Sequence, residues 1–254
     1  MKQFLYVANW KMNLSFTQEV AFAKQNQTDL IELSKKSDTT IVLCPSFCSL
    51  APLSEIFKNS TVALGAQDCS AYKLGAHTGQ IHAQTLAELG CTYCIVGHSE
   101  KRTQCHETNE QIAQKVAHLA ACNITPIICI GETIKDHRAG KTLSILEEQL
   151  APIVTAFAHA ETIPPLCFAY EPIWAIGTGV IPTPETLKTT YAWLRAHLQQ
   201  KLGHASQNTR LIYGGSVDEQ TGAKITALTD IDGLLIGCAS LDFQKFKKIV
   251  ELQR

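Results

Sequence analysis

The sequence predicts an α/β protein, a single (β/α)8 barrel of parallel strands with residues 1–254 forming one domain. Eight short apolar runs recur along the 254 residues, most of them separated by segments with helical periodicity. Runs that are apolar throughout are typical of parallel strands covered by helices. Eight such units in about 250 residues, without a break in composition, favour a closed barrel. A doubly wound open sheet is the alternative.

The predicted strands are rich in Val, Ile, Leu and Cys. Each is long enough for one buried strand and too short for a helix. They lie at Phe4–Ala8, Thr40–Cys44, Val62–Ala66, Tyr93–Val96, Pro126–Ile130, Leu166–Tyr170, Arg210–Tyr213 and Gly233–Ile236.

The predicted helices carry apolar residues at helical spacing. In Glu107–Cys122, for example, Ile112, Val116 and Leu119 fall on one stripe. The other predicted helices are Thr17–Lys35, Leu50–Lys58, Thr85–Leu89, Leu143–Ala156, Pro184–Leu202, Asp218–Ala227 and Asp242–Leu252.

Composition excludes several classes of function. Hydrophobic residues make up 45% of the chain and charged residues 18%, and the net charge of −1 gives no electrostatic footprint for nucleic acid or an anionic membrane. No apolar run is long enough for a membrane span, and the N-terminus reaches polar residues too early for a secretory signal. We therefore expect a cytoplasmic protein with neither a nucleic-acid nor a membrane partner.

The ten cysteines do not predict a metal site. Most lie inside the apolar runs, where a free cysteine behaves as a small hydrophobic residue. Cys91 and Cys94 match a C-x-x-C pattern, but strand alternation points them to opposite faces and no second pair accompanies them. We expect neither a metal nor a redox function there.

The chain just after the sixth predicted strand combines an acid with an apolar loop. Glu171 lies where Pro172 must end the strand. Segment 172–179 contains Trp174 and Ile176, which are unusually apolar for an exposed loop, and it ends in glycines suited to a hinge. This pattern indicates a base beneath a closing lid. The alternative is a structural ion pair between Glu171 and an arginine beside a packed connection.

Polar and glycine-rich segments follow other strands too, as a barrel with its active site at the C-terminal ends of the strands requires. Asn9 and Lys11 follow the first strand, and His98 follows the fourth. Segments 213–217 and 236–241 follow the last two strands and precede apparent helices. Their backbone N–H groups are suited to hold a phosphate, with Lys11 adding a positive charge.

Five motifs carry a resemblance that runs from end to end. They are Asn-Trp-Lys-Met-Asn at 9–13, Gly-His-Ser-Glu at 97–100, the lid motif at 170–179, Tyr-Gly-Gly-Ser-Val at 213–217 and the segment 237–241. In order and spacing the chain resembles the triosephosphate isomerase family. The lid motif and the Gly-His-Ser-Glu motif are each highly specific. That family is itself a standard example of pKa tuning and lid closure, so both properties come with the resemblance.

The resemblance implies a glycolytic and gluconeogenic isomerase that interconverts dihydroxyacetone phosphate and D-glyceraldehyde 3-phosphate through an enediol(ate). It implies that Glu171 is the base, neutral His98 the electrophile, and Lys11 the electrostatic and phosphate anchor. Ser99 after His98 suits a helix N-cap, and the positive end of a helix there favours a neutral ring. No metal or organic cofactor is implied.

The resemblance also implies a set of binding and supporting residues. Glu100 would pair with Lys11, although an acid in a first helical turn is an alternative role for it. Ile176 and Leu235 would press on the base once the lid, residues 172–179, has closed. The substrate-binding residues would be Asn9, Lys11, Gly177, Ser216, Gly237 and Cys238.

Two departures from the family pattern concern the phosphate site and the dimer. Cys238 replaces a common glycine, which is tolerable where φ is not strongly positive. Segment 75–80 resembles the loop that interlocks the family's subunits, with His77 and Gln80 in place of Phe and Glu. A homodimer is therefore expected, in which this loop, around Thr78, reaches the partner's active site.

Two rival functions share part of this pattern. A barrel that binds a triose phosphate as a sensor or scaffold, without turnover, would keep the phosphate corner. Other phosphosugar barrels would also keep that corner but would lack the Glu171 lid. Turnover of glyceraldehyde 3-phosphate separates the first rival from an isomerase.

Overall fold

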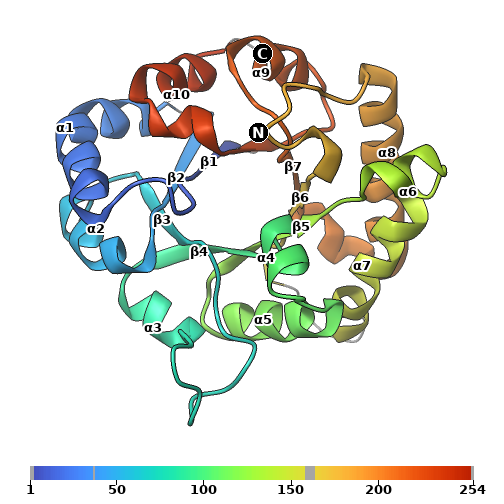
Figure 1. Ribbon diagram of the computed structural model, residues 1–254, viewed down its shortest axis with the longest axis horizontal. Helices are drawn as coiled ribbons and strands as arrows, with labels where there is room; N and C mark the ends of the chain where they lie inside the picture. The colour runs from blue at the N-terminus through green and yellow to red at the C-terminus, as the bar shows by residue number, and fades with distance from the viewer. Residues whose placement is uncertain (1–2, 37, 158–163, 253–254) are drawn as a thin grey trace.

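The computed structural model describes residues 3–36, 38–157 and 164–252, and they form a closed (β/α)8 barrel. Figure 1 shows the strands around a central axis with the helices outside them. The strands follow one another around the barrel in chain order, each parallel to its neighbour. β1 pairs with β8, where Leu5 is in register with Gly233, and this pairing closes the sheet. The predicted fold class is confirmed, and the open sheet is excluded.

Every predicted strand is confirmed, with ends that differ by at most two residues. The largest difference is at β4, which begins two residues earlier than predicted, at Cys91. The strands are β1 (Phe4–Asn9), β2 (Thr39–Cys44), β3 (Ala63–Ala66), β4 (Cys91–Val96), β5 (Thr125–Ile130), β6 (Cys167–Tyr170), β7 (Arg210–Tyr213) and β8 (Gly233–Ile236).

The eight predicted helices are present as well. α4 and α6, of six and five residues, lie outside the predicted ranges and are too short for a long apolar stripe. The helices are α1 (Phe16–Ser34), α2 (Leu50–Ile56), α3 (Ala83–Glu88), α4 (Ser99–Gln104), α5 (Asn109–Ala121), α6 (Ile134–Arg138), α7 (Thr142–Phe157), α8 (Pro184–Leu202), α9 (Glu219–Thr226) and α10 (Phe243–Val250), with short 3-10 turns η1 (Phe47–Ser49), η2 (Ile173–Ala175), η3 (Gly203–Asn208) and η4 (Cys238–Leu241).

Strand alternation divides the core into two layers. Leu5 and Val7 of β1 belong to a compact cluster with inward-facing residues of the other strands, which fills the barrel. Phe4 and Tyr6 belong to the larger cluster that packs the strands against the helices. Both layers are almost fully buried, so the strand ends are held in a rigid frame.

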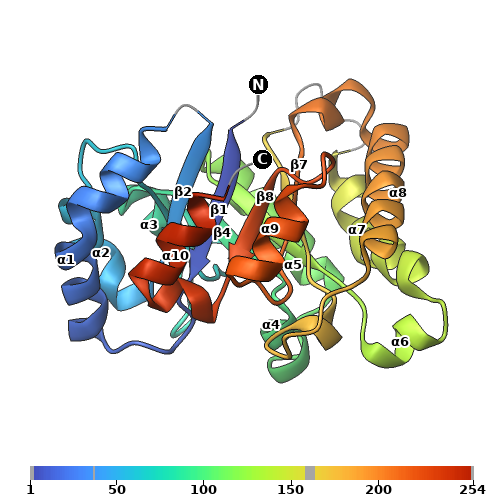
Figure 2. The same ribbon diagram turned by 90° about the horizontal axis from the view of Figure 1, so that it is seen from above.

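The loops that follow the strands gather at one end of the barrel. Figure 2 shows α4 and α6 at that end, while β1 begins at the other. Between β3 and α3 a long loop extends outward from the barrel (Figure 1), and every residue of its segment 72–80 is exposed. No helix in the described ranges is both long enough and apolar enough to cross a membrane.

Candidate active site

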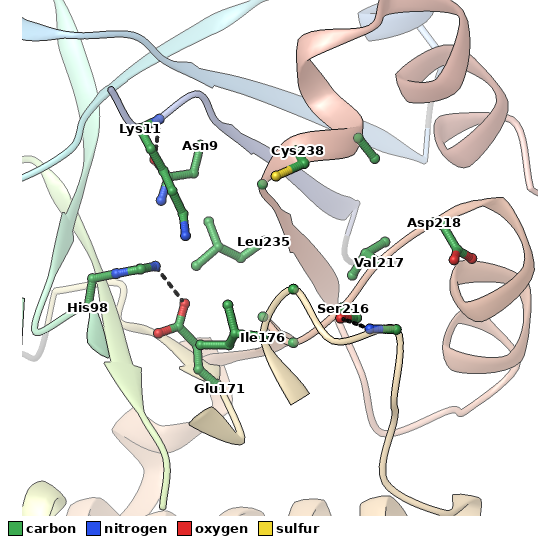
Figure 3. Close-up of a pocket in the computed structure, with 16 residues that line it drawn as sticks. Asn9, Lys11, His98, Glu171, Ile176, Ser216, Val217, Asp218, Leu235 and Cys238 are labelled. Carbon is green, nitrogen blue, oxygen red and sulfur yellow. Dashed lines mark hydrogen bonds and ion pairs between the residues drawn. The ribbon is translucent and has the colours of Figure 1, made fainter. Parts of the chain in front are cut away.

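A pocket of about 300 Å³ opens at the C-terminal ends of the strands (Figure 3). The predicted site residues line it, except Glu100, which lies in an adjoining pocket next to Lys11. Residues at the ends of β1, β4, β6, β7 and β8 and in the loops after them therefore converge as the sequence predicts. The predicted residues that line the pocket are Asn9, Lys11, His98, Glu171, Ile176, Gly177, Ser216, Leu235, Gly237 and Cys238.

Glu171 is held rigidly just after β6. Its backbone N–H donates to the Ile130 carbonyl at 2.7 Å, and the residue is only 2% exposed. Gly214 makes room for it, because a Cβ at that position would lie 2.7 Å from Cγ of Glu171. Burial raises the pKa of the Cys129 thiol, and the nearby Glu171 carboxylate raises it further, so this thiol stays protonated.

The carboxylate of Glu171 faces His98 and not an arginine. Its Oε1 lies 3.5 Å from Nε2 of His98 (Figure 3). Its Oε2 makes no hydrogen bond with the described part of the chain, and no arginine there lies within salt-bridge distance of the carboxylate. The structural ion pair with an arginine is thus not what this site contains.

His98 is fixed by the start of α4. Its Nδ1 accepts the backbone N–H of Glu100 at 3.2 Å, so His98 itself is the N-cap. The prediction that Ser99 caps this helix is wrong, because an imidazole nitrogen takes the N–H that a serine hydroxyl would otherwise accept. A nitrogen that accepts an N–H carries no hydrogen, which assigns the ring proton to Nε2, the atom that faces Glu171.

Lys11 reaches the pocket from the loop after β1. Its Nζ pairs with Glu100 Oε1 at 2.7 Å, as expected from the resemblance. Its backbone is left-handed, with φ of 52°, and its N–H donates to Asn9 Oδ1 at 3.1 Å (Figure 3). The ammonium group lies beside a carboxylate and opposite the glycine-rich loops, so it can meet negative charge on a ligand.

The glycine-rich corner differs from the sequence prediction in one respect. The Asp218 carboxylate accepts the N–H groups of Gln220 and Thr221 at the start of α9, so this helix end is already capped. These backbone hydrogen bonds hold the pKa of Asp218 below its usual value. The backbone N–H groups left to meet an anion would be those of the loops and of η4, which begins at Cys238. Cys238 is not among the residues with positive φ, so the condition for tolerating it is met.

The lid segment 172–179 is bonded to the loop after β7. Ser216 Oγ donates to the Ala175 carbonyl at 2.5 Å. The same oxygen accepts the Gly179 N–H at 3.2 Å (Figure 3). Gly177 and Gly179 have φ of 68° and 74°, which L side chains rarely adopt. The C-terminal end of the apolar segment thus has a local backbone conformation suited to a hinge.

Comparisons with known proteins agree with this geometry. The family model described as triosephosphate isomerase matches residues 4–253. The chain belongs to the triosephosphate isomerase family. Proteins named triosephosphate isomerase are similar along its length: one from Coxiella burnetii (strain Dugway 5J108-111) is 38% identical, covering 96% of this chain and 95% of its own. The protein from Paracidovorax citrulli is 39% identical, with 98% of each chain covered. The protein from Chelativorans sp. is 40% identical, covering 96% of this chain and 94% of its own.

In this member of the triosephosphate isomerase family, Glu132 contacts segment 172–179 and was not predicted from the sequence. It follows β5, is fully buried and accepts hydrogen bonds from Trp174 Nε1 at 2.9 Å and Tyr170 Oη at 3.3 Å. Burial and the Glu132 carboxylate raise the pKa of Tyr170. A lone acid after a strand is a weak signal; its placement after β5, next to β6 and the lid, is the feature that singles it out.

Proposed function

We propose that this chain is a triosephosphate isomerase, interconverting dihydroxyacetone phosphate and D-glyceraldehyde 3-phosphate through an enediol(ate). The observation that carries the proposal is the buried Glu171 carboxylate 3.5 Å from Nε2 of His98, in a pocket that also contains Lys11. Isomerisation moves a proton between two adjacent carbons, so it needs a base, a donor to the oxygens and a grip on the phosphate.

In this mechanism Glu171 is the base. It removes a proton from the carbon next to the carbonyl and returns it to the neighbouring carbon. His98 is the electrophile, and its Nε2–H donates to the substrate oxygens as they gain charge. A neutral imidazole is closer in proton affinity to an enediolate than an imidazolium is, which suits a proton that is shared in the transition state.

The remaining predicted residues bind and enclose the substrate. Lys11 neutralises charge on the enediolate and phosphate, Asn9 adds an amide donor beside it, and Glu100 orients the ammonium group. Backbone N–H groups hold the phosphate, and two apolar side chains shield the base from water. The phosphate donors are Gly177, Ser216, Gly237 and Cys238, and the shielding side chains are Ile176 and Leu235.

The lid has a protective role in this proposal. An enediolate phosphate that is exposed to water can eliminate its phosphate, and closure of residues 172–179 excludes that side reaction. The reaction needs no metal or organic cofactor, because fixed charges and hydrogen-bond donors supply the stabilisation.

We further propose that the protein is a homodimer. Segment 72–80 is exposed throughout, and Tyr72 and Leu74 are 48% and 72% exposed. Met12, in the loop after β1, is 95% exposed. Apolar side chains so far from any core of their own favour contact with another surface. In the proposed dimer, a partner's loop would reach the pocket next to Lys11 and Asn9.

The other expectations from the sequence remain part of the proposal. Residues 1–254 act as one domain in the cytoplasm, with a triose phosphate as the substrate and with neither nucleic acid nor membrane as a partner. The net charge of −1 supports the last two points.

Turnover of glyceraldehyde 3-phosphate by the purified protein tests the proposed function. An isomerase yields dihydroxyacetone phosphate, measured with a coupled dehydrogenase, and inorganic phosphate inhibits it competitively. A phosphate-binding sensor or scaffold would bind the same sugar phosphate in calorimetry without any product. Binding without turnover would therefore exclude the isomerase and favour the rival.

A further inference from the structure

We infer that Gln67 is a positioning residue for Lys11, holding its strained backbone so that the ammonium group points into the pocket. Gln67 lies in the loop after β3 and is half-buried. It is not part of any motif that carries the family resemblance. The inference rests on the function proposed above for Lys11.

The need for such a residue comes from the conformation of Lys11. A φ of 52° brings Cβ of an L residue close to its own backbone, and a lysine side chain gives no local compensation. Conformations of this kind persist only where the surroundings impose them. The direction of the whole Lys11 side chain depends on this backbone conformation. A residue that fixes the turn therefore also fixes the position of the ammonium group.

Gln67 bonds to this turn directly. Its side-chain Nε2 donates to the Lys11 carbonyl at 2.9 Å and to the Cys44 carbonyl, at the end of β2, at 3.0 Å. The Lys11 N–H is bonded to Asn9 at 3.1 Å, so both sides of the turn have partners. One amide group in the loop after β3 thereby ties together the loop after β1 and the end of β2.

The chemistry of the side chain explains why glutamine suits this position. Its NH2 group has two hydrogens, and two carbonyls accept them. A glutamate of the same shape presents only acceptors at neutral pH and would repel both carbonyls. A methionine of similar length has no donor. Both substitutions should release the Lys11 turn while keeping most of the volume.

The experiment compares Gln67→Met and Gln67→Glu with the wild-type protein, measuring kcat, KM and the inhibition constant of inorganic phosphate. We expect both variants to raise the phosphate inhibition constant about tenfold and to lower kcat about ten- to hundredfold, because displacing a catalytic group by about 1 Å has costs of this size. Sedimentation and thermal unfolding report whether each variant keeps the assembly state and fold. If Gln67→Met folds poorly, Gln67→Glu still tests the inference, because glutamate keeps the shape of the glutamine side chain.

Gln27→Met is the matched control. In the wild-type protein, Nε2 of Gln27 in α1 donates to the carbonyl of Ile56 in α2, away from the pocket. This variant should lose thermal stability while the phosphate inhibition constant stays unchanged. Folded Gln67 variants with wild-type kcat and phosphate inhibition would overturn the inference.

Lys11→Met, measured in the same way, distinguishes a failure of the role of Gln67 from a failure of the role proposed for Lys11. If Lys11→Met loses phosphate inhibition and the Gln67 variants do not, only the role of Gln67 is wrong. If Lys11→Met itself binds phosphate normally, the function proposed for Lys11 fails, and the inference about Gln67 fails with it.

Discussion

Glu171 combines burial with freedom to accept a proton. Only 2% of it is exposed, and one of its oxygens makes no hydrogen bond to the described residues. The other faces the ring nitrogen of His98. A carboxylate in such a place is rigid, close to its partner and short of solvent, which are the properties a proton-transferring base requires.

Glu171→Asp should lower kcat by roughly two to four powers of ten, because removing one methylene retracts the base from the reacting carbon. KM should change little, since the phosphate contacts lie on other loops. Steady-state kinetics in both directions measure the effect. A large rise in KM with a nearly normal kcat would mean that Glu171 serves in binding and not as the base.

Lys11→Met should lose both phosphate binding and turnover. Removing one partner of a desolvated charge pair typically costs a few kcal/mol, so the phosphate inhibition constant should rise about a hundredfold or more. Lys24→Met removes the same charge from the exposed surface of α1 and serves as the control. If Lys11→Met still binds phosphate as the control does, the glycine-rich loops alone hold the phosphate.

Among the contacts between structural elements, the one between segment 172–179 and the loop after β7 bears most directly on the lid. Ser216 bonds both Ala175 and Gly179 through one hydroxyl. That hydroxyl therefore stabilises the arrangement of residues 172–179 seen here. In the proposed function, the backbone N–H of Ser216 also binds the phosphate, so a single residue would link the lid and the phosphate site.

Ser216→Ala removes these lid contacts and keeps the backbone donor. Two lost hydrogen bonds of about 1 kcal/mol each should lower kcat roughly tenfold or more. The fraction of turnovers that release inorganic phosphate should increase, because the enediolate is less protected. Ser144→Ala, which removes an exposed bond to the Lys141 carbonyl, is the control. Unchanged kcat and phosphate release would show that this hydroxyl does not stabilise the lid.

The sequence predicts elements well where one physical signal dominates. The strands are apolar throughout, so their positions agree within two residues, and α8 has the predicted bounds. α6 has no stripe, and the cap of α4 depends on an imidazole nitrogen that no propensity rule anticipates. The sequence does not predict the roles of Glu132 and Gln67, for a related reason. Their roles come from contacts between loops that follow different strands, which a linear pattern does not display.

At the scale of the whole molecule, the loop between β3 and α3 exposes apolar side chains to solvent. The projecting loop carries Tyr72 stacked on His77 at a ring distance of 4.4 Å, with Leu74 exposed beside them. The stack gives the loop some order of its own, but its apolar atoms remain in water. A second subunit would cover them and close the side of the site next to Lys11.

Sedimentation at dilute concentration should therefore show a homodimer, and Leu74→Asp should shift it toward the monomer, because a charge buried in an interface is costly. Activity should fall with the dimer fraction, since Asn9 and Lys11 lose the neighbouring loop. Ile134→Asp provides the comparison, because this residue is exposed on α6 and should leave the association unchanged. A fully active monomer would contradict the proposed dependence on the partner.

Running the isomerisation in D2O tests whether Glu171 moves a proton between two carbons of the substrate. Glu171 should exchange its proton with solvent while the enediolate is bound, so NMR should find deuterium on the carbon that receives the proton. Glu171→Asp should slow this incorporation together with turnover. A product without deuterium would mean that the transferred hydrogen never exchanges with solvent. That result, or unchanged incorporation in Glu171→Asp, would contradict the mechanism.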